Sequence, residues 1–184
     1  SETGNAYTIT ITDTTAAAAD LNALDGKTTV DVIVTSVTTI TGSYSDINTL
    51  YTNTANFTGL GDEAFVVTGP ITVTEFNTLN TRTSGAITAS IASTELDDDG
   101  ANNLVDLTSG SGDLLTISVT DATVEAADLT TMVGKTSLDI DVSGVGTITG
   151  TTAAQLTAVF STNAARYLGL GDQNITLSGT HSFA

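Results

Sequence analysis

A short pattern of apolar residues recurs along this chain and constrains its fold more than any other feature. Each copy has a polar residue, a large apolar residue, two small or polar residues and a second large apolar residue. The clear copies are Asp20–Leu24, Asp46–Leu50, Glu75–Leu79, Asp128–Met132 and Gln155–Val159, and Asn103–Leu107 is a degenerate further copy. The apolar residues stand at positions i and i+3, which places both side chains on one face of a helix. The sequence therefore predicts one short helix in every stretch of roughly 27 residues.

A longer duplication contains these copies. Residues 12–42 match residues 120–150 without a gap, and the turn-like sequence Gly-Leu-Gly-Asp at residues 59–62 recurs at residues 169–172. We therefore predict three parts: a first repeat unit at residues 1–91, an acidic junction at residues 92–113 and a second repeat unit at residues 114–184.

Between the predicted helices, apolar and polar residues alternate, as in strands with one covered face. The strands are expected at residues 7–12, 30–34, 115–119, 138–142 and 173–178. A strand, a helix and another strand at short spacing imply parallel pairing through right-handed crossovers. The predicted fold class is α/β: a repeat solenoid with parallel short strands and one short helix per coil of about 27 residues. The alternative is a pair of all-β sandwiches, which the helical i, i+3 pairs disfavour.

Capping residues support two of these helices and mark the ends of two others. Ser43, with Asp46 three residues later, and Thr72, with Glu75 three residues later, have the spacing of a capping box at a helix N-terminus. Gly26 and Gly134 follow two of the apolar pairs, where a glycine in the left-handed conformation commonly ends a helix.

Charge and composition restrict the classes of partner. The 184 residues include 21 acidic and 4 basic side chains, for a formal net charge of −17, which repels nucleic acid and anionic membranes. The chain has no cysteine, hence no disulfide or thiolate metal site. No targeting segment and no apolar run of about 18 residues is visible. We therefore expect a soluble, extracellular or cell-surface chain, either mature or cut from a longer protein.

Residues 95–106 have the ligand order of a calcium-binding loop. Acidic side chains stand at positions 1, 3, 5 and 12 of this stretch, and a glycine stands at position 6, where the loop must turn. The predicted calcium ligands are Glu95, Asp97, Asp99, Ala101, Asn103 and Asp106. Position 12 is Asp rather than the usual bidentate Glu, which predicts weak affinity. The alternative is a solvated acidic linker between the two repeat units.

Two further motifs have structural explanations. Gly26-Lys27-Thr28 and Gly134-Lys135-Thr136 match the end of a P-loop, but Leu21 and Leu129 stand where that motif needs its first glycine. We expect the two lysines to meet carbonyl groups at helix C-termini instead. We also expect the Gly-Leu-Gly-Asp sequences to form tight turns.

The sequence contains no arrangement of a nucleophile, a base and an orienting group. Its one histidine, His181, lies in the last four residues, and no Gly-x-Ser-x-Gly motif occurs. We predict that the protein is not an enzyme and has no catalytic or organic-cofactor-binding residues.

The stretch DTTAAAADLNALDGKTTVDVIVTSVTTITG, followed by GLGDEAFVVTG, resembles the tandem repeats of giant cell-surface proteins of marine cyanobacteria and similar secreted bacterial proteins. The resemblance covers most of the chain except residues 92–113. It implies a surface-exposed, array-forming and non-enzymatic role.

These features predict a structural module of a bacterial cell-surface protein. The predicted terminal strands leave unprotected edges, which invite another chain. We expect the module to associate end to end with copies of itself or with adjacent like modules, in a fibre or surface layer stabilised by calcium. The alternative is an adhesin or glycan-binding module, although aromatic residues, which would stack on sugars, make up only 5% of the chain.

Overall fold

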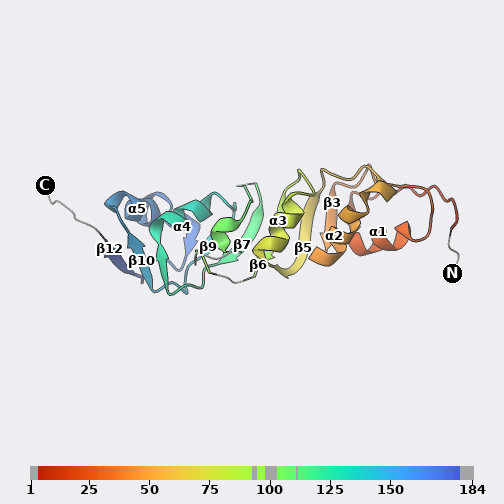
Figure 1. Cartoon of the computed structure of the whole chain (residues 1–184). Coiled ribbons are helices and arrows are strands. Elements are labelled where there is room, and N and C mark those ends of the chain that lie inside the picture. The colour runs from red at the N-terminus through yellow and green to blue at the C-terminus, as the bar shows by residue number, and fades with distance from the viewer. Residues whose placement is uncertain (1–3, 93–94, 98–102, 111, 179–184) are drawn as a thin grey trace. The chain divides into compact units, whose positions relative to one another are not determined.

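The computed structural model describes residues 4–92, 95–97, 103–110 and 112–178. The chain divides into two compact units (Figure 1). Unit 1 comprises Ser1–Ile71 and Glu75–Ser90, and unit 2 comprises Thr72–Thr74 and Ile91–Ala184. The predicted junction, residues 92–113, thus falls within unit 2, and its treatment as a separate part stays a prediction.

Unit 1 is built from short strands, each of the first three helices following a strand of one sheet. Its strands are β1 (Thr15–Ala17), β2 (Val32–Ile33), β3 (Thr39–Gly42), β4 (Phe57–Thr58), β5 (Ala64–Ile71) and β6 (Ile87–Ile91). The order β1-β3-β5-β6 forms one sheet, and β2 pairs with β4 in another. The pairs β1–β3, β3–β5 and β2–β4 are parallel. Thr10 adds a parallel bridge to Ile33, so the predicted strand at residues 7–12 is reduced to this bridge.

Two helices of unit 1 bury both residues of the apolar pairs predicted from the sequence, and the first helix buries Leu21 of its pair. They are α1 (Ala18–Asp25), α2 (Tyr44–Thr52), α3 (Val73–Asn80) and the 3₁₀ helix η1 (Thr54–Asn56). Ile47 and Leu50 of α2 and Phe76 and Leu79 of α3 are fully buried. In Figure 1, α1 and α2 lie side by side over the strands. Burial of these faces stabilises helices that are too short to persist alone.

Unit 2 repeats the same alternation of elements. Its strands are β7 (Leu114–Ser118), β8 (Thr123–Glu125), β9 (Ile140–Asp141), β10 (Thr147–Gly150), β11 (Tyr167–Leu168) and β12 (Asn174–Leu177). Its helices are η2 (Leu104–Asp106), α4 (Ala126–Val133), α5 (Ala153–Thr157), the π-helical turn η3 (Ala158–Thr162) and η4 (Ala164–Arg166). The strands β8, β10 and β12 form one parallel sheet, and β7, β9 and β11 are paired in parallel as well.

The fold is therefore mixed α/β with parallel strands. Helices follow β1, β3 and β5 in unit 1 and β8 and β10 in unit 2, so the all-β alternative is wrong. The degenerate copy at Asn103–Leu107 forms the 3₁₀ helix η2 rather than an α-helix, although Leu104 and Leu107 are buried. Among the described residues, no helix combines the length and apolar character needed to cross a membrane.

The capping predictions are right for Ser43 and wrong for the glycines. The Ser43 hydroxyl accepts a hydrogen bond from the Asp46 N–H at 3.2 Å. Gly26 and Gly134 have φ values of −71° and −79°, in the right-handed region. In each case the lysine that follows donates its N–H three residues back, to Leu24 or Met132. Such bonds satisfy the last helical carbonyls without a left-handed residue.

Threonine and serine hydroxyls join neighbouring segments of the chain. Thr38 Oγ1 donates to the Thr14 carbonyl, 24 residues earlier, and Thr149 Oγ1 donates to the Val124 carbonyl, 25 residues earlier. Thr28 Oγ1 donates to the Tyr7 carbonyl at 2.7 Å. Each of these hydrogen bonds links segments of the chain that lie more than 20 residues apart in the sequence. These bonds give the threonines, about a fifth of the chain, a structural role.

Candidate functional site

The predicted calcium ligands do not form a single loop site among the described residues. Asp99 and Ala101 lie outside the described residues. The two limbs of the stretch meet through the backbone, because the Leu104 N–H donates to the Glu95 carbonyl at 3.0 Å and the Val105 N–H to the Leu96 carbonyl at 3.2 Å. This pairing brings positions 1 and 10 of the stretch together.

The C-terminal limb directs its side chains toward its own 3₁₀ helix. Asn103 and Asp106 form a reciprocal capping box at the start of η2. Asp106 Oδ2 accepts the Asn103 N–H at 3.1 Å. One oxygen of the predicted twelfth ligand is therefore already engaged with the backbone of its own loop.

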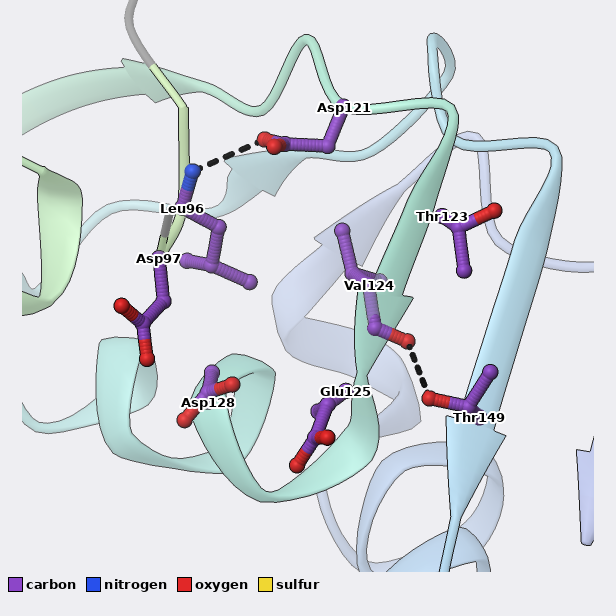
Figure 2. Close-up of a pocket in the computed structure, with 8 residues that line it drawn as sticks. All are labelled: Leu96, Asp97, Asp121, Thr123, Val124, Glu125, Asp128 and Thr149. Atoms are coloured by element: carbon purple, nitrogen blue, oxygen red, sulfur yellow. Dashed lines mark hydrogen bonds between the residues drawn. The ribbon is translucent and has the colours of Figure 1, made fainter. Parts of the chain in front are cut away.

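The N-terminal limb instead borders an acidic cavity of about 410 Å³ in unit 2 (Figure 2). The carboxylates that line it are Asp97, Asp121, Glu125 and Asp128. Asp121 Oδ2 accepts the Leu96 N–H at 2.8 Å and so fixes the limb beside strand β8. Figure 2 shows Asp97 and Asp128 directed to the same part of this cavity.

Burial and the neighbouring carboxylates both affect the protonation of Asp128. Partial burial, followed by the nearby charges of Asp97 and Glu125, raises the pKa of the Asp128 carboxyl above its ordinary value. The folded state therefore binds a proton at Asp128 more tightly than the unfolded chain does. It follows that stability falls as pH rises through the window between the ordinary pKa and the raised one. A cation in the cavity would relieve the same repulsion.

The arrangement is acidic but is not a preformed metal centre. Within the part of the chain that the structure describes, no group of three or more His, Cys, Asp or Glu side chains is placed to hold a metal ion. The calcium prediction is therefore neither confirmed nor contradicted. Nothing in the sequence marks Asp121, Glu125 and Asp128 as site residues, because their approach to Asp97 depends on which segments pack together.

The remaining motifs have structural positions. Lys135 Nζ donates to the carbonyl of Leu107, the C-cap residue of η2, which confirms for this lysine the predicted contact with a helix C-terminus. Gly59, Gly61, Gly169 and Gly171 have positive φ values, as expected for tight turns. His181 lies outside the described residues.

Comparisons with known proteins identify no relative. No family model matches the chain, and neither a curated protein nor a solved structure matches it. The resemblance to bacterial surface repeats therefore stays a prediction.

Proposed function

We propose that this chain is a non-enzymatic, extracellular structural module of a bacterial cell-surface protein, built as an α/β solenoid that associates end to end. Support for stacked coils comes from the register of the parallel strands. Thr15 of β1 pairs with Thr39 of β3, and Thr39 pairs with Ala64 of β5, at separations of 24 and 25 residues. In unit 2, Thr123 pairs with Thr147 and Thr147 with Asn174, at separations of 24 and 27 residues. Each strand thus lies beside its equivalent one coil away.

The observation that carries the proposal is the incomplete burial of β12. Ile175 of β12 pairs with Ile148, and the residue at the equivalent position of unit 1 is Phe65, which pairs with Ile40. Phe65 is 0% exposed, because β5 is followed by α3 and has β6 on its other side, whereas Ile175 is 55% exposed. An inward-facing apolar position is left uncovered by the described residues of unit 2.

Neighbouring positions show the same pattern. Leu177 is 36% exposed, while its equivalent Val67 is 8% exposed. Leu168 of β11 is 54% exposed at an outward-facing position, since its equivalent Thr58 is also exposed, and it adds apolar surface beside β12.

In the first coil of unit 1, Tyr7 is 51% exposed. Val30 is 42% exposed, but its equivalent Leu138 in unit 2 is exposed to a similar degree, 38%. Apolar surface of this kind, next to an open strand edge, commonly marks an interaction site.

A parallel edge at each end favours a head-to-tail contact between copies. In such a contact the β11–β12 edge of one copy meets the first strands of the next, so each copy keeps one free edge of each kind. A heterologous contact of this type produces open filaments unless the rotation closes a ring. The formal charge of −17 opposes close approach of copies, so cations should promote the contact.

Replacing Ile175 with lysine tests the contact. Sedimentation velocity of the wild-type chain should show oligomers that grow with protein concentration, and Ile175→Lys should remain monomeric because a charge would be buried in the contact. Val66→Lys is the matched control, since Val66 is a 39% exposed strand residue at a different site, and it should associate like the wild type. A wild-type chain that stays monomeric at all concentrations, with and without calcium, would contradict the self-association.

Calcium should stabilise the fold through the acidic cavity. We expect saturating calcium to raise the melting temperature by about 2–4 °C. The double variant Asp97→Asn with Asp128→Asn should melt at a higher temperature without calcium and lose most of the calcium-dependent rise, because the repulsion is already removed. The measurement is differential scanning calorimetry at constant ionic strength.

The control for this experiment changes the net charge equally at exposed sites. Asp13→Asn with Asp172→Asn removes two exposed carboxylates outside the cavity. This control should keep the full calcium response. Equal responses in both double variants would show that calcium acts by general screening, and the cavity would lose its role.

A further inference from the structure

Two turns of the chain are equivalent in structure but differ in the polar side chain that packs against them. The first follows α1 and the second follows α4, and both contain Thr at the same position, Thr28 and Thr136. The Thr28 hydroxyl accepts the Val30 N–H at 3.2 Å, and the Thr136 hydroxyl accepts the Leu138 N–H at 3.1 Å. The two turns therefore have the same local hydrogen bonding.

The segment that packs against each turn is also equivalent. The 3₁₀ helices η1 and η4 end at Asn56 and Arg166, and each is followed by a short parallel strand. Phe57 pairs with Val32, and Tyr167 pairs with Ile140, which is the counterpart of Val32 in the duplication. Asn56 and Arg166 thus occupy the same position relative to the two turns.

In unit 2 a guanidinium group occupies the turn. Arg166 Nη2 donates to the Thr136 carbonyl at 2.7 Å and to the Leu138 carbonyl at 2.6 Å. Arg166 Nε lies 3.6 Å from Asp139 Oδ1. Two carbonyls and one carboxylate therefore hold the planar donor group.

In unit 1 the shorter Asn56 leaves this place open. Its Nδ2 donates to Asp25 Oδ2 at 3.1 Å, and a cavity of about 180 Å³ remains. The residues lining it are Asp25, Thr28, Thr29, Val30, Asp31 and Asn56. Asp31 is the counterpart of Asp139, and Thr28 and Val30 are the counterparts of the two residues whose carbonyls bind Arg166.

The cavity in unit 1 is also more negative than the equivalent place in unit 2. Asp25 stands where unit 2 has Val133, so the cavity is lined by two carboxylates, while the cation of unit 2 is replaced by a neutral amide. Lys27 is close in sequence but is not among the residues that line the cavity. The cavity is smaller than the 300–1,000 Å³ that drug-sized ligands occupy, which suits a small head group.

We propose that this cavity is a receptor site for a guanidinium group supplied from outside the chain, either by an arginine side chain of a partner protein or by a small alkylguanidine. The residues that would supply its acceptors, Thr28, Val30 and Asp31, are the counterparts of those that hold the Arg166 guanidinium in the duplicate turn. Asp25 adds a second carboxylate, which compensates for the entropic cost of binding a separate molecule. Lysine and simple ammonium ions fit less well, because they lack the planar fork that reaches two carbonyls and a carboxylate together.

The test uses agmatine as the probe and the chain itself as a source of matched variants. At ten times its dissociation constant, agmatine should raise the melting temperature by about 3–6 °C, and choline at equal ionic strength should not. Asn56→Arg should raise the melting temperature without ligand and abolish the agmatine response, because its own guanidinium fills the cavity. Asn56→Gln, which is polar but uncharged, should keep the response, and Asp31→Asn should weaken it.

A second arm distinguishes the sources of the guanidinium. A short peptide with one exposed arginine should compete with agmatine in an NMR titration that follows the Asn56 side-chain amide, if partner arginines bind as well as small alkylguanidines. A peptide that does not compete would restrict the site to small molecules. An agmatine response equal to that of choline, or one retained in Asn56→Arg, would overturn the proposal. Neither result depends on self-association, since the same titration can be made with the Ile175→Lys variant.

Discussion

Gly59→Ala and Gly169→Ala are each expected to destabilise the protein by about 3–5 kcal/mol. Both glycines have positive φ values, +105° and +76°. A Cβ atom at Gly59 would lie 2.8 Å from Thr35 Cγ2 and 2.9 Å from Thr35 Cα, and one at Gly169 would lie 2.7 Å from Ser143 Cβ. The substitution therefore adds a steric clash with the neighbouring backbone to the strain of a left-handed residue.

The same two turns contain the matched controls. Gly61 and Gly171 have φ values of +141° and +140°, but a Cβ atom at either would meet nothing within 4 Å. Their alanine variants should lose only about 1–2 kcal/mol of stability, the cost of the left-handed backbone conformation alone. Urea unfolding followed by circular dichroism measures the difference. If all four variants lost equal stability, the close approach to Thr35 and Ser143 would not limit the packing of these turns.

Tyr51→Phe is expected to cost about 2–4 kcal/mol, because it removes a donor from a buried carboxylate. Glu63 is 0% exposed, and its Oε2 accepts hydrogen bonds from the Tyr51 hydroxyl and, at 2.9 Å, from the Gly61 N–H. Tyr167→Phe is the control, since the Tyr167 hydroxyl donates to a neutral acceptor, the Leu129 carbonyl, at 2.9 Å. That variant should lose about 1 kcal/mol. Chemical denaturation at pH 7 compares the two.

Glu63→Gln should, by contrast, be neutral or stabilising. Glu63 Oε1 is buried and has no hydrogen-bond partner. The equivalent residue of unit 2 is Gln173, whose Oε1 accepts the Gly171 N–H at 2.8 Å and whose Nε2 donates to the Gly169 carbonyl at 2.8 Å. A glutamine at position 63 can make the same bonds with Gly61 and Gly59. A large loss of stability in Glu63→Gln would show that unit 1 depends on the charge of the carboxylate.

The Tyr51–Glu63 contact also predicts a pH dependence at alkaline pH. Burial, together with the hydrogen bond and charge of Glu63, raises the pKa of the Tyr51 phenol above its ordinary value of 10.0. The folded state thus keeps a proton that the unfolded chain releases, so stability should fall as pH rises above about 10. Tyr51→Phe should show a flatter decline over the same range, which thermal melting at pH 8–11 would detect.

Sequence periodicity predicted the local elements well. The i, i+3 spacing located α1 to α5, because an amphipathic helix must bury its apolar stripe. The spacing of apolar residues along the sequence is enough to identify such a stripe. The alternation of residues likewise located β7 and β9. The duplication identified equivalent positions such as Phe65 and Ile175 only once the strand register had aligned them.

Tertiary packing decided the sites. The sequence grouped Asp97 with Asp99 and Asp106, since ligands of a loop site lie close along the chain. In the structure, Asp97 lies beside Asp128 at the acidic cavity, and Asp106 caps η2. Nothing in the order of residues shows which segment lies next to another. The cavity beside Asn56 is also a product of packing, because it exists only where a short side chain faces the turn that Arg166 fills in the duplicate. The residue order determined the fold class and the periodic burial of its helices, which depend on local spacing. Only the tertiary structure decided which polar groups converge, because convergence depends on distances between segments far apart in the chain.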